Sequence, residues 1–455
     1  MRYLGIDLGT SFLKGAVLDL DLLSIGPVRR VPCPPPVSGL PPTRAEFNPE
    51  GFVIAARQMI EELLGEAPDC RGLLTCGQMG GLVLVSPEGK ALSNYISWQD
   101  RRLVEPHPSG LGSFYDLLTA RLSPDDWCNL GREIRPGTPL SYLFWLAEAR
   151  EPLPTQAFAA TLPDFVLSRL CGTSPATHPS NATGAINVLT GSWDFGIFDR
   201  LGFGHIHWPA LREANEILGE IRRLRVPCHP AVGDHSCALA GVLLEEGELS
   251  LNISTGSQVS MRSEMAEPGD YQTTPFFDGQ FIHRISNLPA GRALDALLRL
   301  LTELAQSQGI ELRDPWSYIS KAAEAKTGTN LRANLAFFPT PLGDSGSLTN
   351  LREDNLTVGD LFQGAFLNMV DNYHQSAQRL SPAQSWMRLV FSGGLAQKLN
   401  LLRSLIIEKF RCPHRLGPCA EDTLNGLLVL ALFANGRTNS VEESMNLLRR
   451  GHPPS

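Results

Sequence analysis

The sequence predicts an α/β protein made of two related domains, and three observations support this. Apolar patterns typical of strands and of helices alternate along the whole chain. The 455 residues are more than one hydrophobic core usually serves. A hairpin pattern at residues 5–19 returns in altered form at residues 249–264. We therefore expect one domain at 1–245 and a second at 246–455, hinged at the acidic stretch Glu245–Glu248.

The first hairpin carries groups suited to phosphate and to a metal ion. Asp7 ends an apolar strand, Thr10 and Ser11 follow in a glycine turn, and Lys14 begins the returning strand. Backbone N–H groups in such a turn, with hydroxyls and a cation, suit phosphate oxygens. The carboxylate of Asp7 suits a hydrated Mg²⁺ ion. On this segment alone, an ordinary amino-terminal hairpin is an equally good interpretation.

Two later turns resemble parts of the same kind of site. Thr255, Gly256 and Ser257 lie in the turn of the second hairpin, and Gly393-Gly394 joins an apolar strand to a helix. A glycine pair at a helix start lets a ligand approach the backbone closely. Either turn alone could simply reverse the chain, but their order along the chain favours a nucleotide site.

Asp234 is the candidate catalytic base. It follows Gly233 at the start of a small-residue helix, just ahead of the expected domain boundary. An aspartate at a helix start is often only a cap. Phosphoryl transfer, however, needs little beyond positioning, charge neutralisation and a carboxylate that accepts the hydroxyl proton.

Composition excludes several classes of function. The net charge of −8 leaves no basic surface for nucleic acid. The start of the chain lacks the pattern of a signal peptide, and no apolar run has the length of a membrane span. The nine cysteines are irregularly spaced, which favours reduced thiols over disulfides or a zinc site. We expect a cytoplasmic protein without a membrane partner, and the sequence leaves a homodimer open.

Taken together, the ordered motifs resemble a sugar kinase of the FGGY family, within the actin-like ATPase superfamily. They read DLGTS at 7–11, EFNPEG at 46–51, GQMGG at 77–81, SWQDRR at 97–102, PSNATG at 179–184, GDHSCALAG at 233–241, ISTGS at 253–257 and SGGLAQ at 392–397. The resemblance implies two ribonuclease-H-like domains flanking a cleft, with ATP and Mg²⁺ as cofactors and a small sugar or polyol as substrate.

The resemblance also implies a role for each candidate residue. Asp7 would associate with magnesium, and Asp234 would be the general base. The ATP-binding candidates are Thr10, Ser11, Lys14, Thr255, Gly256, Ser257, Gly393, Gly394 and Gln397. The sugar-binding candidates are Gln78, Met79, Trp98, Asp100, His235 and Arg135.

One departure from the family bears on the sugar. Pentulose kinases of the family usually carry Met-His-Gly where this chain has Met79-Gly80-Gly81. We expect Gly80 to leave room for a longer ketose such as sedoheptulose. A xylulose kinase and a glycerol-type polyol kinase are the alternatives. An actin-like ATPase switch, or a degenerate kinase that only senses sugar, would be alternatives of another class.

Overall fold

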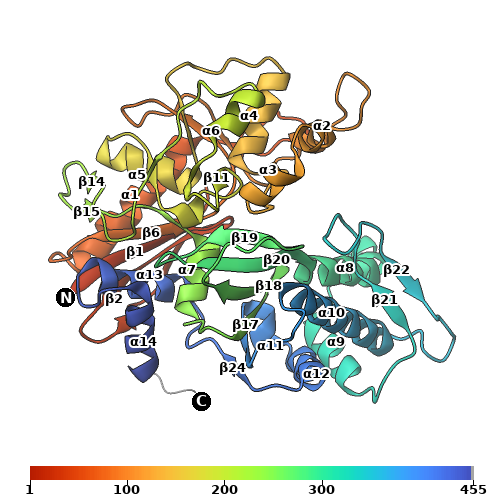
Figure 1. Ribbon diagram of the computed structural model, residues 1–455. Coiled ribbons are helices and arrows are strands. Elements are labelled where there is room, and N and C mark those ends of the chain that lie inside the picture. Colours follow the sequence, from red (N-terminus) through yellow and green to blue (C-terminus); the bar gives the residue numbers. More distant parts are fainter. Residues whose placement is uncertain (452–455) are drawn as a thin grey trace.

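The computed structural model describes residues 1–451 and contains two mixed sheets, one in each half of the chain (Figure 1). The first sheet has the order β14-β15-β6-β1-β2-β3, with β16 beside β6 and β4 beside β2. Its strands are β1 (Arg2–Leu8), β2 (Phe12–Asp19), β3 (Ser24–Ile25), β4 (Arg29–Pro32), β6 (Leu73–Gly77), β14 (Gly219–Glu220), β15 (Pro227–Cys228) and β16 (Val232–Gly233).

The second sheet lies in the later part of the chain and has the order β19-β20-β18-β17-β23-β24. Its strands are β17 (Glu248–Ile253), β18 (Gly256–Ser263), β19 (Gln272–Pro275), β20 (Phe281–Pro289), β23 (Arg388–Ser392) and β24 (His414–Leu416). Strand β1 pairs antiparallel with β2 and parallel with β6. Strand β17 likewise pairs antiparallel with β18 and parallel with β23. The predicted internal repeat is therefore confirmed in the strand pairing.

Helices cover both faces of the first sheet, because its central strands are apolar on both sides. Leu4, Ile6 and Leu8 of β1 pack with α1 (Pro49–Glu66) and α5 (Leu162–Cys171). On the other face, Tyr3 belongs to a core shared with α7 (Asp234–Gly241), α13 (Asp422–Ala434) and α14 (Val441–Gly451). The carboxyl-terminal helices thus pack against the amino-terminal sheet.

Further helices and short strands complete the two halves. A separate core lies above the first sheet in Figure 1 and includes residues of α2 (Phe114–Ala120), α4 (Pro139–Glu148) and α6 (Phe195–Arg200). The second sheet packs with α8 (Gly291–Ser307), α9 (Pro315–Glu324), α10 (Val358–Leu380) and α12 (Asn400–Phe410). The other elements are β5 (Glu46–Phe47), β7 (Val83–Val85), β8 (Tyr95–Ile96), α3 (Pro124–Asn129), β9 (Phe158–Ala160), β10 (Ala176–Thr177), β11 (Ile186–Asn187), β12 (Ser192–Trp193), β13 (Ala210–Leu211), β21 (Arg332–Asn334), β22 (Ser347–Thr349), α11 (Gly394–Lys398) and two short 3-10 helices (Arg102–Val104 and Pro179–Asn181). Within residues 1–451, no helix combines the length and apolar character that crossing a membrane requires.

Helices α7 and α13 cross in direct backbone contact between the two sheets. A Cβ atom at Gly241 would lie 1.8 Å from the carbonyl oxygen of Asp422. One at Gly426 would lie 1.9 Å from the carbonyl oxygen of Cys237. Both positions therefore require glycine. These contacts place the start of α13, at Asp422, beside the end of α7, whereas Asp234 lies at the opposite end of α7.

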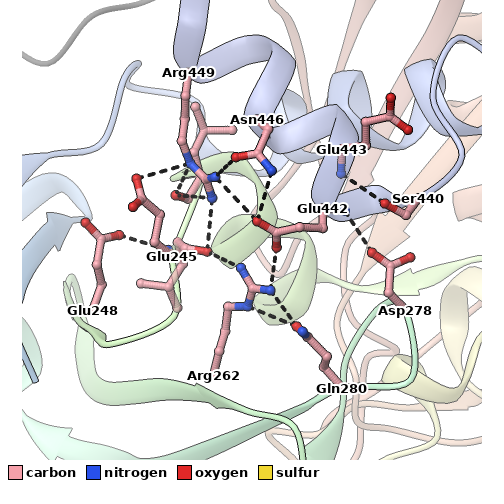
Figure 2. A network of polar contacts seen from close by, with 12 residues as sticks. Glu245, Glu248, Arg262, Asp278, Gln280, Ser440, Glu442, Glu443, Asn446 and Arg449 are labelled. Carbon is pink, nitrogen blue, oxygen red and sulfur yellow. Dashed lines mark hydrogen bonds and ion pairs between the residues drawn. The ribbon is translucent and has the colours of Figure 1, made fainter. Parts of the chain in front are cut away.

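Arginine side chains hold the linker between α7 and β17. Arg262 donates to the carbonyl oxygen of Leu244 at 2.7 Å, and Arg449 of α14 donates to that of Leu243 at 3.1 Å (Figure 2). Arg415 also donates to the Leu243 carbonyl, at 2.9 Å. Leu243 has a left-handed φ of 56°, which an L-residue adopts at a cost unless its surroundings hold it. The arginines thus fix the linker at the predicted hinge.

Candidate active site

The predicted first hairpin is confirmed, and its register brings two candidate residues together. Asp7 and Lys14 are directly opposite in the β1–β2 ladder. Thr10 and Ser11 are exposed in the turn between these strands. The indole Nε1 of Trp98 donates to the Thr10 hydroxyl at 3.2 Å, so the hairpin tip and a sugar-binding candidate are in contact.

Asp7 is a buried carboxylate with one oxygen available. Its Oδ2 accepts a hydrogen bond from the Thr423 hydroxyl at 2.8 Å. Its Oδ1 is buried and has no hydrogen-bond partner among residues 1–451. Burial raises the pKa of Asp7, against the hydrogen bond from Thr423 and the nearby charge of Lys14. An unpartnered carboxylate oxygen suits a magnesium ion that keeps most of its waters.

The start of α13 adds acidic groups that the sequence analysis missed. Lys14 forms an ion pair of 2.9 Å with Glu421. The carboxylate of Asp422 accepts a hydrogen bond from the Gly393 N–H, and burial raises its pKa to about 7. The sequence offered a weak signal here, because acidic residues at the start of an apolar helix usually only complement the helix dipole.

The turn of the second hairpin exposes two of its three candidates. Thr255, between β17 and β18, and Gly256, the first residue of β18, are exposed. A Cβ atom at Gly256 would meet no atom of the described chain within 4 Å. Ser257, by contrast, is buried, and its hydroxyl lies 2.8 Å from that of Tyr373 in α10. The Ser257 side chain therefore belongs to the core, and only its backbone can face a ligand.

The glycine pair packs against this second hairpin. Gly393 has a φ of +85°, and a Cβ atom there would lie 2.5 Å from the carbonyl oxygen of Ile253. A side chain is therefore excluded at this position. Gly394 faces open space, because a Cβ atom there would contact no atom of the described residues within 4 Å. Gln397 is exposed one turn later. This arrangement leaves the backbone of α11 accessible to a ligand.

Asp234 begins α7 at the junction of both halves. Its carboxylate accepts a hydrogen bond from the backbone N–H of His235 at 2.7 Å. Burial raises the pKa of Asp234 to about 7, and the charge of Asp7 adds to this rise. Arg284 and Arg135 oppose it. A carboxylate with a pKa near neutrality is a suitable general base at physiological pH.

His235 and Arg135, two sugar-binding candidates, contact the second sheet. The Gln258 amide lies 2.8 Å from His235 Nδ1, and the Ser260 hydroxyl lies 3.1 Å from its Nε2. Burial lowers the pKa of His235, which favours the neutral ring. Arg135 donates to the Ser286 hydroxyl at 3.3 Å. Both residues therefore bridge the two halves.

The other sugar-side candidates are mostly buried. Gln78 donates to the carbonyl oxygen of Gly9 at 3.2 Å and accepts from the Tyr95 hydroxyl at 2.9 Å. Both oxygens of Asp100 accept hydrogen bonds from Arg102, and one also accepts from the backbone N–H of Ala45. Gln78 and Asp100 thus hold loops in place.

Of the two remaining sugar-side candidates, Met79 is also buried, and its side chain packs against Gly233 beside the base. Trp98 is 44% exposed, and its side chain is more accessible than those of Gln78, Met79 and Asp100.

The expectation that Gly80 leaves room for a longer sugar is wrong. A Cβ atom at this position would lie 2.7 Å from the carbonyl oxygen of Gly137 and 2.8 Å from Cβ of Trp98. The loop before α4 thus occupies the space that a side chain would need. Gly80 thus reflects close packing of these loops.

Comparison with solved structures identifies the fold. The fold matches that of a gluconate kinase from Lactobacillus acidophilus, with a TM-score of 0.85 at 17% identity over 100% of this chain and 93% of that one. A xylulose kinase from the same organism matches with a TM-score of 0.84 at 16% identity, over 100% and 92%. The predicted fold is confirmed: it is the two-domain actin-like fold of sugar kinases.

The family follows from the sequence comparisons. Residues 2–226 match the N-terminal domain of the FGGY family of carbohydrate kinases. The sedoheptulokinase of Mus musculus is 23% identical over 94% of this chain and 96% of its own length. That of Homo sapiens is 24% identical with the same coverage. The chain belongs to the FGGY family and is a carbohydrate kinase, as its motifs predicted.

Proposed function

We propose that this kinase transfers the γ-phosphoryl group of ATP to a hydroxyl of a ketose of the sedoheptulose type, with Asp234 as general base. The observation that carries the proposal is the position of Asp234. It begins the helix that leads from the first sheet to the second, close enough to Asp7, Arg135 and Arg284 for their charges to act on it.

The residues of the chain divide the work of phosphoryl transfer. Asp234 would accept the proton of the attacking hydroxyl as the new P–O bond forms. Lys14 and the exposed turns at Thr10 and Thr255 would bind the phosphates through their N–H groups, hydroxyls and charge. Gly394 would let the adenosine lie against the start of α11.

Magnesium fits this arrangement. The buried, unpartnered Oδ1 of Asp7 offers an oxygen ligand, either directly or through water. The described residues form no cluster of three or more histidine, cysteine or acidic side chains suited to a metal. One carboxylate would therefore share the ion with phosphate and water. When bound, magnesium would neutralise charge on the phosphates.

Domain closure is part of the proposal, with the boundary at residue 245. The chain passes from the first sheet to the second through α7 and the linker between α7 and β17. Arginine side chains donate hydrogen bonds to carbonyl groups of this linker. Closure would bring both phosphate hairpins together and exclude water, so that ATP reacts with sugar and not with water.

The sugar is proposed from the relatives. Sedoheptulokinases match almost the whole chain, whereas a Bacillus subtilis xylulose kinase matches 65% of it and a Marinomonas glycerol kinase 34%. ADP release should be measured with sedoheptulose, xylulose, other ketoses, aldoses and glycerol. We expect the largest kcat/KM with sedoheptulose. A larger value with xylulose or glycerol would refute the sugar assignment.

The role of Asp234 has its own test. We expect Asp234→Asn to abolish sugar phosphorylation and to bind ATP nearly as well as the unmodified protein. Asp295→Asn, which changes an exposed aspartate of α8, is the matched control and should turn over normally. An Asp234→Asn variant with unchanged turnover would show that another group is the base.

A further inference from the structure

A buried ion pair joins the two halves of the molecule beside the candidate base. Arg284 belongs to β20, and Glu133 lies in the loop that follows α3. Their closest approach is 2.5 Å, and a second hydrogen bond from Arg284 Nε measures 2.9 Å. The two side chains are 3% and 1% exposed. The charges come from segments that the domain boundary at residue 245 assigns to different domains.

The Glu133 loop also docks on β19 through its backbone. Thr273 N–H donates to the carbonyl oxygen of Gly131 at 2.8 Å, and the Thr274 hydroxyl donates to Glu133 at 2.7 Å. Gly131 has a φ of +62°, and a Cβ atom there would lie 2.0 Å from the Thr273 carbonyl oxygen. Only glycine permits this approach. In Figure 1, α3 lies directly above β19 and β20.

This contact reaches the candidate base through arginines. Arg135, in the same loop as Glu133, donates to Ser286 of β20. Arg284 is directly opposite Ser260 in the β18–β20 ladder, and the Ser260 hydroxyl lies 3.1 Å from Nε2 of His235, the residue that follows Asp234. The charges of Arg284 and Arg135 also lower the pKa of Asp234. Glu133 itself bonds to Arg284 and Thr274, and its Oε2 has no partner among the residues described.

The physical chemistry of such a pair favours a role in alignment. When the domains part, both charges return to water. When they close, a correctly aligned pair is buried with its hydrogen bonds made, whereas either charge buried alone is strongly unfavourable. The pair therefore adds little attraction of its own but penalises every misaligned closed state.

We propose that Glu133 and Arg284 form an interdomain latch that completes the active site, placing Arg284 and Arg135 beside Asp234 only when the domains are closed in register. Both are positioning residues, since neither accepts nor donates the reacting proton. The inference rests on the proposed function, because it assumes that Asp234 is the base and that closure precedes transfer.

Single substitutions test the latch through a split between kcat and KM. Glu133→Gln or Arg284→Gln would each leave one buried charge unpaired in the closed state. We expect kcat to fall about tenfold or more, because small errors in alignment slow transfer strongly. The KM for ATP should change by less than about twofold, since neither substitution removes a group that is proposed to bind ATP. Lys326→Gln removes an ion pair with Asp360 inside the second domain and is the matched control.

The double variant Glu133→Gln/Arg284→Gln removes both charges and restores a neutral contact. We expect it to turn over faster than either single variant, a non-additivity that two independent structural defects would not produce. Thermal unfolding of each variant, followed by circular dichroism, checks that both domains remain folded. If a single variant fails to fold, Thr274→Val, which removes one hydrogen bond and leaves no unpaired charge, should still lower kcat without raising the KM for ATP.

The outcomes separate the latch from the proposed function. Normal kcat in both single variants, or additive losses in the double variant, would overturn the latch while Asp234→Asn remains inactive. If the unmodified protein phosphorylates no sugar, or if Asp234→Asn remains active, the proposed function fails first and the latch fails with it.

Discussion

Replacing Asp234 with asparagine should stabilise the fold while it removes activity. Burial and the charge of Asp7 raise the pKa of Asp234 from 3.8 to about 7. A shift of about three units corresponds to about 4 kcal/mol of unfavourable free energy once the native carboxyl is ionised. Asp234 is half-buried, and water reaching it reduces this to about 2 kcal/mol. Asparagine carries no charge and escapes this penalty.

The pH dependence gives the sign of the effect. A carboxyl whose native pKa is raised favours the folded state most below its unfolded pKa of 3.8 and loses that contribution as pH rises through about 7. The gain from asparagine should therefore be about 2 kcal/mol at pH 8 and less than half of that at pH 5. Urea unfolding of both proteins at pH 5 and pH 8, without nucleotide or magnesium, measures this difference in the free energy of unfolding. A gain independent of pH, or a loss of stability at pH 8, would refute a desolvated carboxylate.

Three further predictions concern other parts of the site. Gly394→Ala should fold normally, because its Cβ enters open space, but should raise the KM for ATP several-fold; an unchanged KM would remove Gly394 from the nucleotide site. Gly80→His should lower the free energy of unfolding by about 2 kcal/mol through overpacking, and a stable variant with new pentulose activity would contradict this. Arg449→Ala should cost about 1 kcal/mol in thermal unfolding by removing its hydrogen bond to the Leu243 carbonyl, whereas Arg450→Ala, which changes an exposed neighbour, should cost nothing measurable.

The sequence was informative where the signal is local. The turns at Gly9 and Gly256 lie between short apolar strands, so the strand pattern and the turn residues agree within about a dozen positions. The second hairpin could be found by comparison with the first. Asp234 could be found because the glycine before it and the helix after it are both visible in the sequence.

Contacts between distant segments could not be predicted. Thr423 reaches Asp7 across 416 residues, and Arg284 reaches Glu133 across 151. Nothing in the local pattern of either segment indicates its partner. The misinterpretation of Gly80 has the same origin, because the atom that fills its space belongs to Gly137, in a loop whose position depends on the whole fold. The sequence also does not show that the Ser257 hydroxyl turns into the core, because its partner Tyr373 lies 116 residues away.

Phosphorus NMR of the reaction products tests the central claim most directly. Incubation of the protein with ATP, magnesium and sedoheptulose should produce a sugar phosphate monoester in equal amount to ADP, and Asp234→Asn should produce neither. Release of inorganic phosphate with no sugar phosphate, at a rate that sugar does not change, would instead indicate an ATPase and contradict phosphoryl transfer to a sugar hydroxyl.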